Sequence, residues 1–81
     1  MGSTKVSLTK RKKYITNVVA EYGGPLAFLS TVQDKLNDKT IRYQRVINWR
    51  ERGNIPLSIA IQLANKLDLD VKFLNKDGHR V

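Results

Sequence analysis

The chain has 81 residues, which is enough for one domain around one small hydrophobic core. It contains no cysteine, so disulfides and thiolate metal sites are excluded. Its formal net charge is +8, from 15 basic and seven acidic residues. Such a basic excess on a short chain favours a polyanionic partner, and the alternative is that the charge serves solubility alone.

The positive charge is concentrated at two places along the chain. Residues 1–20 carry five basic side chains and no acidic one, and residues 41–54 carry a net charge of +3. The other two segments, 21–40 and 55–81, are close to neutral. Two separated basic segments are the pattern expected of a protein that contacts a polyanion at two points.

The N-terminal third predicts an arm followed by a helix. Residues 1–9 are expected to be flexible or extended, and a first helix is expected over residues 10–22. Its apolar positions recur at spacings of three and four: Ile15, Val18, Val19 and Tyr22. Gly23 and Gly24 are expected to end this helix, because glycine accepts the left-handed conformation that follows many helices.

The next segment predicts two short helices. Pro25 begins the first of these, since its missing N–H would be unpaired at that position anyway, and the helix extends to about Asn37. Its apolar stripe consists of Leu26, Leu29, Val32 and Leu36. After a polar break, a third helix is expected from Ile41 to Arg52, capped by Thr40 or Asp38 and stopped by Gly53-Asn54.

A fourth helix is expected from Ile55-Pro56 to the Asp68-Leu69-Asp70 segment. Its wide apolar face predicts burial of Leu57, Ala60, Ile61, Ala64 and Leu67, with Ile59 and Leu63 beside them. Residues 71–81 are expected to form a short strand (71–74) with a turn, or a tail; a strand would need a partner, either residues 6–8 or a second copy. The fold class predicted for residues 1–81 is a single, compact, mainly α domain of four to five helices, with an optional short C-terminal β-strand or hairpin.

The second and third helices, residues 25–52, are the candidate functional unit. Two short helices joined by a polar break, the second polar on its outer face, are typical of a helix-turn-helix. In that motif the second helix lies in the major groove of DNA and the first crosses the backbone. The third helix has an apolar seam of Ile41, Val46 and Trp49, and its spacing predicts that Trp49 packs in the core.

Five residues on the polar face are predicted to recognise base edges: Arg42, Tyr43, Gln44, Arg45 and Asn48. Amide side chains match adenine, whereas the guanidinium of arginine matches guanine or phosphate, so Arg42 and Arg45 are left open between bases and backbone. Tyr43 is expected to pack on the sugar-phosphate or a thymine methyl group, or to cover the edge of the core. The alternative for the amides is that they are solvated helix residues.

A second set is predicted to hold phosphates: Lys10, Arg11, Lys12, Lys13, Thr40, Arg50 and Arg52. Cations at the start of a helix oppose its dipole, which favours the run from Lys10 to Lys13 as an arm over the DNA backbone rather than as a soluble first turn. Arg50 and Arg52 flank the end of the third helix, where cations are also favourable without any ligand.

Residues 44–57 resemble the end of the recognition helix and the start of the next helix in Cro-type phage repressors and related Cro/CI-like regulators. The resemblance covers residues 24–67 and is most specific from Trp49 to Pro56. It departs from the family at residues 36–41, which are longer than the family's Leu-Gly-Val-Ser turn and lack its glycine. The resemblance implies a lambda-repressor-like domain that binds a pseudo-palindromic DNA operator as a homodimer and regulates transcription in the cytoplasm or nucleoid of a bacterial host.

Two other functions fit part of the pattern. An RNA-binding domain would use the same charge, although the aromatic residues lie mostly on faces expected to be buried. A protein-interaction module, such as an antitoxin or adaptor, would use the apolar fourth helix and the tail. No enzyme is expected, since the single His79 has no cysteine or paired carboxylates with it. No metal, cofactor, small-molecule substrate or membrane span is expected either.

Overall fold

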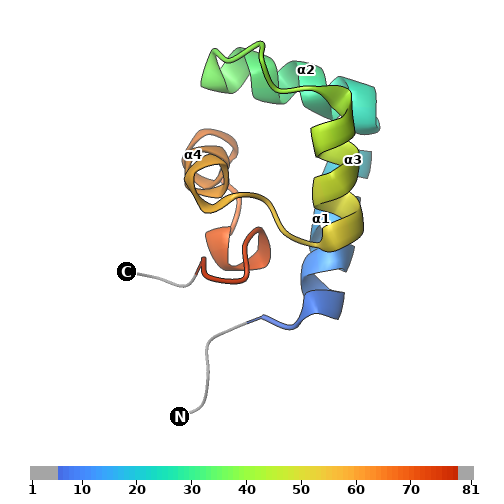
Figure 1. The fold of residues 1–81 in the computed structure, drawn as a ribbon, viewed down its shortest axis with the longest axis vertical. Helices are drawn as coiled ribbons and strands as arrows, with labels where there is room; N and C mark the ends of the chain where they lie inside the picture. The colour runs from blue at the N-terminus through green and yellow to red at the C-terminus, as the bar shows by residue number, and fades with distance from the viewer. Residues whose placement is uncertain (1–5, 79–81) are drawn as a thin grey trace.

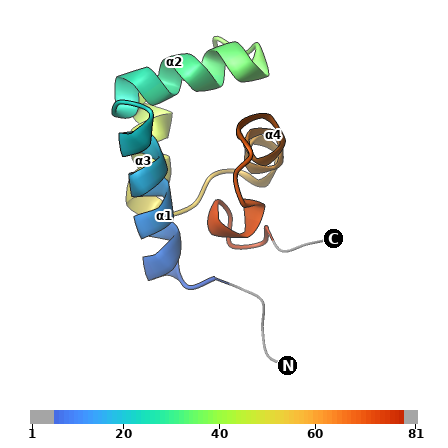
Figure 2. The same ribbon diagram turned by 180° about the vertical axis from the view of Figure 1, so that it is seen from behind.

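The computed structural model describes residues 6–78 of the chain. Over that range the chain forms four α-helices and one short 3-10 helix (Figures 1 and 2). The elements are α1 (Leu8–Glu21), α2 (Pro25–Leu36), α3 (Tyr43–Arg52), α4 (Leu57–Leu67) and η1 (Val71–Phe73). The prediction of a compact, mainly α fold of four to five helices is therefore confirmed.

The helices enclose one core. α1 and α3 lie side by side, and α2 crosses the end that they share (Figures 1 and 2). α4 packs against α2, and η1 packs against both α1 and α4. The fully buried side chains come from every α-helix and from the connecting segments: Ile15, Val19, Phe28, Val32, Ile41, Val46, Ile55, Ala60, Leu63 and Leu74.

α1 begins earlier than expected because Ser7 caps it. The Ser7 hydroxyl oxygen accepts a hydrogen bond from the Lys10 backbone N–H at 3.3 Å, which satisfies one of the unpaired donors of the first turn. Leu8 and Thr9 are therefore helical, which corrects the prediction of an arm up to residue 9. Residues 1–5 of that arm lie outside the described residues, as do residues 79–81 of the expected tail.

Two predicted apolar stripes are rotated in the structure. In α2, Phe28 is buried whereas Leu26 is 69% exposed. In α4, Leu63 is fully buried whereas Leu57 and Ile61 are more than 40% exposed. Both helices carry apolar residues around more than one face, so the neighbouring helices, rather than the spacing alone, decide which face is buried.

The connection between α2 and α3 runs back along α2. Asn37 ends α2 in the left-handed conformation (φ 52°), a role that asparagine fills after glycine. The Gln33 side-chain amide then donates to the Ile41 carbonyl oxygen at 2.8 Å, and Ile41 is 1% exposed. α3 begins at Tyr43, after Arg42, and has no side-chain cap. The cap predicted for Thr40 or Asp38 is wrong, because these two residues bond to each other.

The predicted strand at residues 71–74 is not formed. Val71–Phe73 is a 3-10 turn, and the Asp70 side chain caps it by accepting from the Lys72 backbone N–H. The strand partner expected within the chain is lost, since α1 already begins at Leu8. The segment is held instead by Ile55, whose N–H donates to the Leu74 carbonyl oxygen at 2.7 Å.

The end of α3 is joined to the start of α1 through Arg11 and Gly53. Arg11 is 9% exposed, and its guanidinium donates to the carbonyl oxygens of Gly53 (2.8 Å) and Val6 (2.7 Å). Gly53 has φ +64°, and a Cβ built there would lie 2.6 Å from Lys12 Cγ. Both the backbone conformation and the close approach of α1 therefore favour glycine at this position.

We predict that Gly53→Ala destabilises the fold by roughly 2 kcal/mol or more, because it combines a left-handed alanine with overpacking against α1. Asp68 is a matched control, since it ends α4 with φ 58° and already carries a Cβ. Asp68→Ala should destabilise the fold by a smaller amount, on the order of 1 kcal/mol. Urea unfolding followed by circular dichroism measures both values, and equal losses would show that the approach of α1 adds no constraint.

Candidate nucleic-acid interface

The exposed face of α3 carries polar and cationic side chains, while its inner face joins the core. Val46 and Trp49 are 1% and 4% exposed, which confirms the prediction that Trp49 packs inward. Arg42, Gln44 and Arg45 are exposed at the start of the helix. Helical periodicity therefore separates a core seam from a contiguous polar face, as the sequence predicted.

Gln44 and Asn48 form a pair on this face. The Gln44 Nε2 donates to Asn48 Oδ1 at 3.2 Å, as expected for residues one helical turn apart. That bond uses neither Gln44 Oε1 nor the donor nitrogen of Asn48, so the pair presents an acceptor beside a donor. The major-groove edge of adenine presents the complementary donor (N6) and acceptor (N7). The pair thus has groups that suit an adenine edge.

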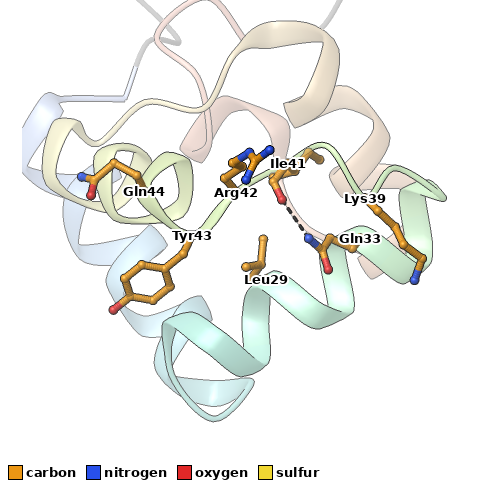
Figure 3. Close-up of a pocket in the computed structure, with 7 residues that line it drawn as sticks. All are labelled: Leu29, Gln33, Lys39, Ile41, Arg42, Tyr43 and Gln44. Atoms are coloured by element: carbon orange, nitrogen blue, oxygen red, sulfur yellow. Dashed lines mark hydrogen bonds between the residues drawn. The ribbon is translucent and has the colours of Figure 1, made fainter.

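An open groove of about 510 Å³ lies where α3 begins, between α3, the connection and α2 (Figure 3). Leu29 and Ile41 contribute apolar surface to it, and the dashed line marks the bond from Gln33 that holds the Ile41 carbonyl. The polar and aromatic side chains of the groove are Gln33, Lys39, Arg42, Tyr43 and Gln44. Cations beside apolar surface suit a sugar-phosphate unit of a nucleic acid backbone.

This groove changes the interpretation of two residues. Tyr43 is 43% exposed and lines the groove, so it does not cover the core edge, which was one of its two predicted roles. Lys39 was not among the predicted site residues, although its charge lies in the polar break of the sequence. The sequence does not reveal that the connection between α2 and α3 folds back along α2, which brings Lys39 and Arg42 into one groove.

A second hollow of about 230 Å³ lies at the other end of α3. Its lining includes residues from α3 and from the segment that follows it: Arg45, Asn48, Trp49, Arg52, Asn54 and Pro56. Arg52 is exposed and Arg50 is half-buried. Asn54 and Pro56 were not among the predicted site residues. Cationic side chains therefore stand at both ends of the polar face of α3.

The basic run from Lys10 to Lys13 is divided by the turn of α1. Arg11 points inward and is bonded to backbone carbonyls, which corrects its predicted role in holding phosphate. The stem of Lys12 lies against Gly53, next to the end of α3. Lys10 and Lys13 line a different hollow, together with Phe73 of η1. Of the four residues in this basic run, Lys12 is the exposed one that lies beside α3.

Thr40 lies beside a negative charge. Its backbone N–H donates to Asp38 Oδ1 at 2.9 Å, and its hydroxyl donates to the same oxygen. These two bonds, with a smaller contribution from the charge of Arg45, hold the pKa of Asp38 below its ordinary value of 3.8. Asp38 is therefore ionised at neutral pH, and a phosphate placed at Thr40 would meet a carboxylate. The structure does not favour Thr40 as a phosphate ligand.

No family model, curated protein or solved structure matches the chain. The interpretation of the α3 face therefore depends on its own residues and geometry. Within residues 6–78, no helix has the length and apolar character needed to cross a membrane.

We predict different effects for two neighbouring lysines on duplex DNA. Lys12→Ala should reduce the slope of log affinity against log salt concentration by about 0.9, the value for one lost phosphate contact. Lys13→Ala should leave the slope unchanged, since Lys13 lines the hollow beside η1. Fluorescence anisotropy over a series of salt concentrations measures the slopes, with Lys35→Ala as the control on α2. A change of slope for Lys13 equal to that for Lys12 would contradict this placement.

Proposed function

We propose that the chain is a sequence-specific, duplex-DNA-binding transcriptional regulator, acting as a Cro-like repressor. The observation that carries the proposal is the polar face of α3, where the Gln44–Asn48 pair lies among exposed arginines. The helix is anchored through Val46 and Trp49, so these side chains project from a rigid element. The resemblance of residues 44–57 to Cro/CI-like regulators supports the same function.

The dimensions of α3 suit the major groove. The helix has 10 residues and is therefore about 15 Å long, whereas the groove is about 12 Å wide. A helix of this length inserted in the groove brings its two ends near the two flanking backbones. Lys39 and Arg42 would hold phosphates at one end, and Lys12 and Arg52 at the other. Gln44 and Asn48 would then meet base edges between them.

The remaining parts of the proposal come from the resemblance. A second copy of the chain would place a second α3 on the same DNA, and the operator would be pseudo-palindromic. Repression would follow from occupation of a promoter in the cytoplasm or nucleoid of a bacterial host. The proposed mechanism needs no cofactor, because DNA recognition here uses side chains alone.

The RNA-binding alternative is less well supported. Sequence-specific RNA recognition relies on aromatic rings that stack on unpaired bases. Of the aromatic residues in the described part of the chain, Tyr43 is the exposed one. A single ring beside a groove provides little stacking surface.

One observation favours the protein-interaction alternative. Leu57 and Ile61 lie one turn apart on α4 and are 41% and 43% exposed. Neighbouring exposed aliphatic side chains are a common feature of protein contacts. A complex formed through them would persist at high salt and after nuclease treatment, whereas DNA binding through several phosphates should weaken steeply with salt.

The proposal is tested by selection from a randomised duplex-DNA library at moderate salt, followed by sequencing. We expect an enriched palindrome whose half-site contains an adenine, because two copies would present the same amide pair. Salt-sensitive binding without any enriched sequence would overturn sequence-specific regulation. Enrichment of a single site without an inverted repeat would support sequence-specific DNA recognition but would overturn the proposal of a homodimer.

Gln44→Ala removes the free acceptor of the Gln44–Asn48 pair, so it should reduce the preference for the selected sequence over random duplex by roughly 1–3 kcal/mol, the usual value of a bidentate base contact. Affinity for random DNA should stay nearly unchanged. Competition binding with the two duplexes measures this ratio. Gln62→Ala, which removes an exposed amide from α4, is the control and should preserve the preference. Equal loss on both duplexes would show that Gln44 does not recognise a base.

A further inference from the structure

A third hollow, of about 200 Å³, lies between α1 and η1. Five residues line it: Lys10, Lys13, Tyr14, Asn17 and Phe73. The rings of Tyr14 and Phe73 are 4.8 Å apart between centroids and are tilted by 38°. The Tyr14 hydroxyl oxygen also accepts a hydrogen bond from the Asp70 backbone N–H at 3.2 Å. We call this hollow the α1–η1 pocket.

The pocket combines apolar surface with positive charge. Tyr14 and Phe73 are half-buried and provide ring surface, whereas Lys10 and Lys13 are exposed and one helical turn apart. Within residues 6–78, the ion pair that the structure contains joins Lys72 to Asp70, so neither Lys10 nor Lys13 is neutralised by a carboxylate there. The charge and the apolar surface of the pocket are both available to a ligand.

The pocket lies on the side of α1 that faces away from α3. In an α-helix successive residues turn by about 100°, so positions 10, 13, 14 and 17 share one side and position 12 lies nearly opposite. Leu8 and Lys12 contact the position of Gly53 at the end of α3. DNA bound along α3 would therefore leave the pocket open. The positive charge of Lys10 and Lys13 is not accounted for by the proposed DNA interface.

We propose that the α1–η1 pocket binds an acidic segment of a protein partner. One apolar side chain of that segment would lie against the ring surface that Tyr14 and Phe73 form together, and flanking carboxylates would meet Lys10 and Lys13. The volume is below the roughly 300 Å³ of typical small-molecule sites, which suits one side chain rather than a cofactor. A nucleic acid backbone would supply anions for the lysines and a sugar edge for the rings, but no projecting side chain that could fill the pocket.

The inference is independent of the proposed DNA binding. Because the pocket and the polar face of α3 lie on different sides of the molecule, a partner and a duplex would bind at the same time. The chain would then connect DNA to a second protein through charge complementarity, which governs encounter and specificity more than affinity.

The test is a titration of the isotope-labelled full chain, followed by the amide chemical shifts of each residue. The probe is a synthetic peptide with one phenylalanine flanked on both sides by glutamates. We expect saturable shifts at Lys13, Asn17 and Phe73, with the α3 amides unmoved. Replacing the phenylalanine by alanine, or the glutamates by lysines, should weaken binding at least tenfold. Shifts centred on α3, or no saturable shift at millimolar peptide, would overturn the proposal.

Two double variants distinguish the effect of charge at the pocket from the effect of the net charge of the chain. Lys10→Glu with Lys13→Glu should weaken peptide binding at least tenfold, whereas Lys35→Glu with Lys66→Glu changes the net charge equally and should bind as the parent chain does. A carboxylate at position 10, in the first turn, suits the dipole of α1, and position 13 is exposed, so the first variant should remain folded, which circular dichroism checks. Equal weakening by both variants would overturn the proposal.

A final arm uses random duplex DNA as competitor. If DNA shifts the same pocket amides and displaces the peptide, the pocket is a second polyanion site and the proposal of a protein partner fails. If DNA shifts α3 and leaves the peptide bound, the two surfaces are independent. Failure of the peptide arm alone would leave the proposed DNA function untouched.

Discussion

The contact between the start of α1 and the end of α3 is the constraint on which the rest of the structure depends. The buried Arg11 guanidinium forms no ion pair with a carboxylate of residues 6–78 and donates instead to the carbonyls of Gly53 and Val6. The Gly53 carbonyl lies at the end of α3, where the helix dipole is negative, so a cation is favourable there. Glycine lets α1 approach closely enough for this bond. With α1 in that place, the apolar side of α3, which carries Val46 and Trp49, faces the core. The polar face of α3 is exposed as a consequence.

The same constraint explains why four consecutive basic residues do not form one patch. Once Arg11 is directed inward, the helical turn places Lys12 beside α3 and places Lys10 and Lys13 beside Phe73. A charge run in the sequence therefore supplies a structural contact, a candidate DNA contact and a separate pocket. We infer that the positive charge of the chain serves two surfaces, the polar face of α3 and the α1–η1 pocket, rather than a single polyanion site.

Local patterns predicted much of the fold, and contacts between distant residues decided the rest. The separation of Val46 and Trp49 from Gln44 and Arg45 follows from the spacing within one helix, so the exposed face of α3 was predictable. The burial of Arg11 was not, because its partner Gly53 lies 42 positions away. The exposure of Leu26 likewise depends on how α2 is rotated by its neighbours. The strand predicted at residues 71–74 failed because Asp70 caps a local turn where no neighbouring strand is present in the described residues.

The connection between α2 and α3 gives the candidate interface its shape. A tight turn would place the start of α3 near the end of α2, but residues 37–42 run back along α2 and are fixed there by the bond from Gln33 to the Ile41 carbonyl. The start of α3 thereby meets the middle of α2, and Lys39 and Arg42 line one groove beside Leu29. The length and path of this connection thus add cationic surface at this end of α3. Because Lys12 and Arg52 stand at the other end, the spacing of the proposed backbone contacts is set by the length of α3 itself.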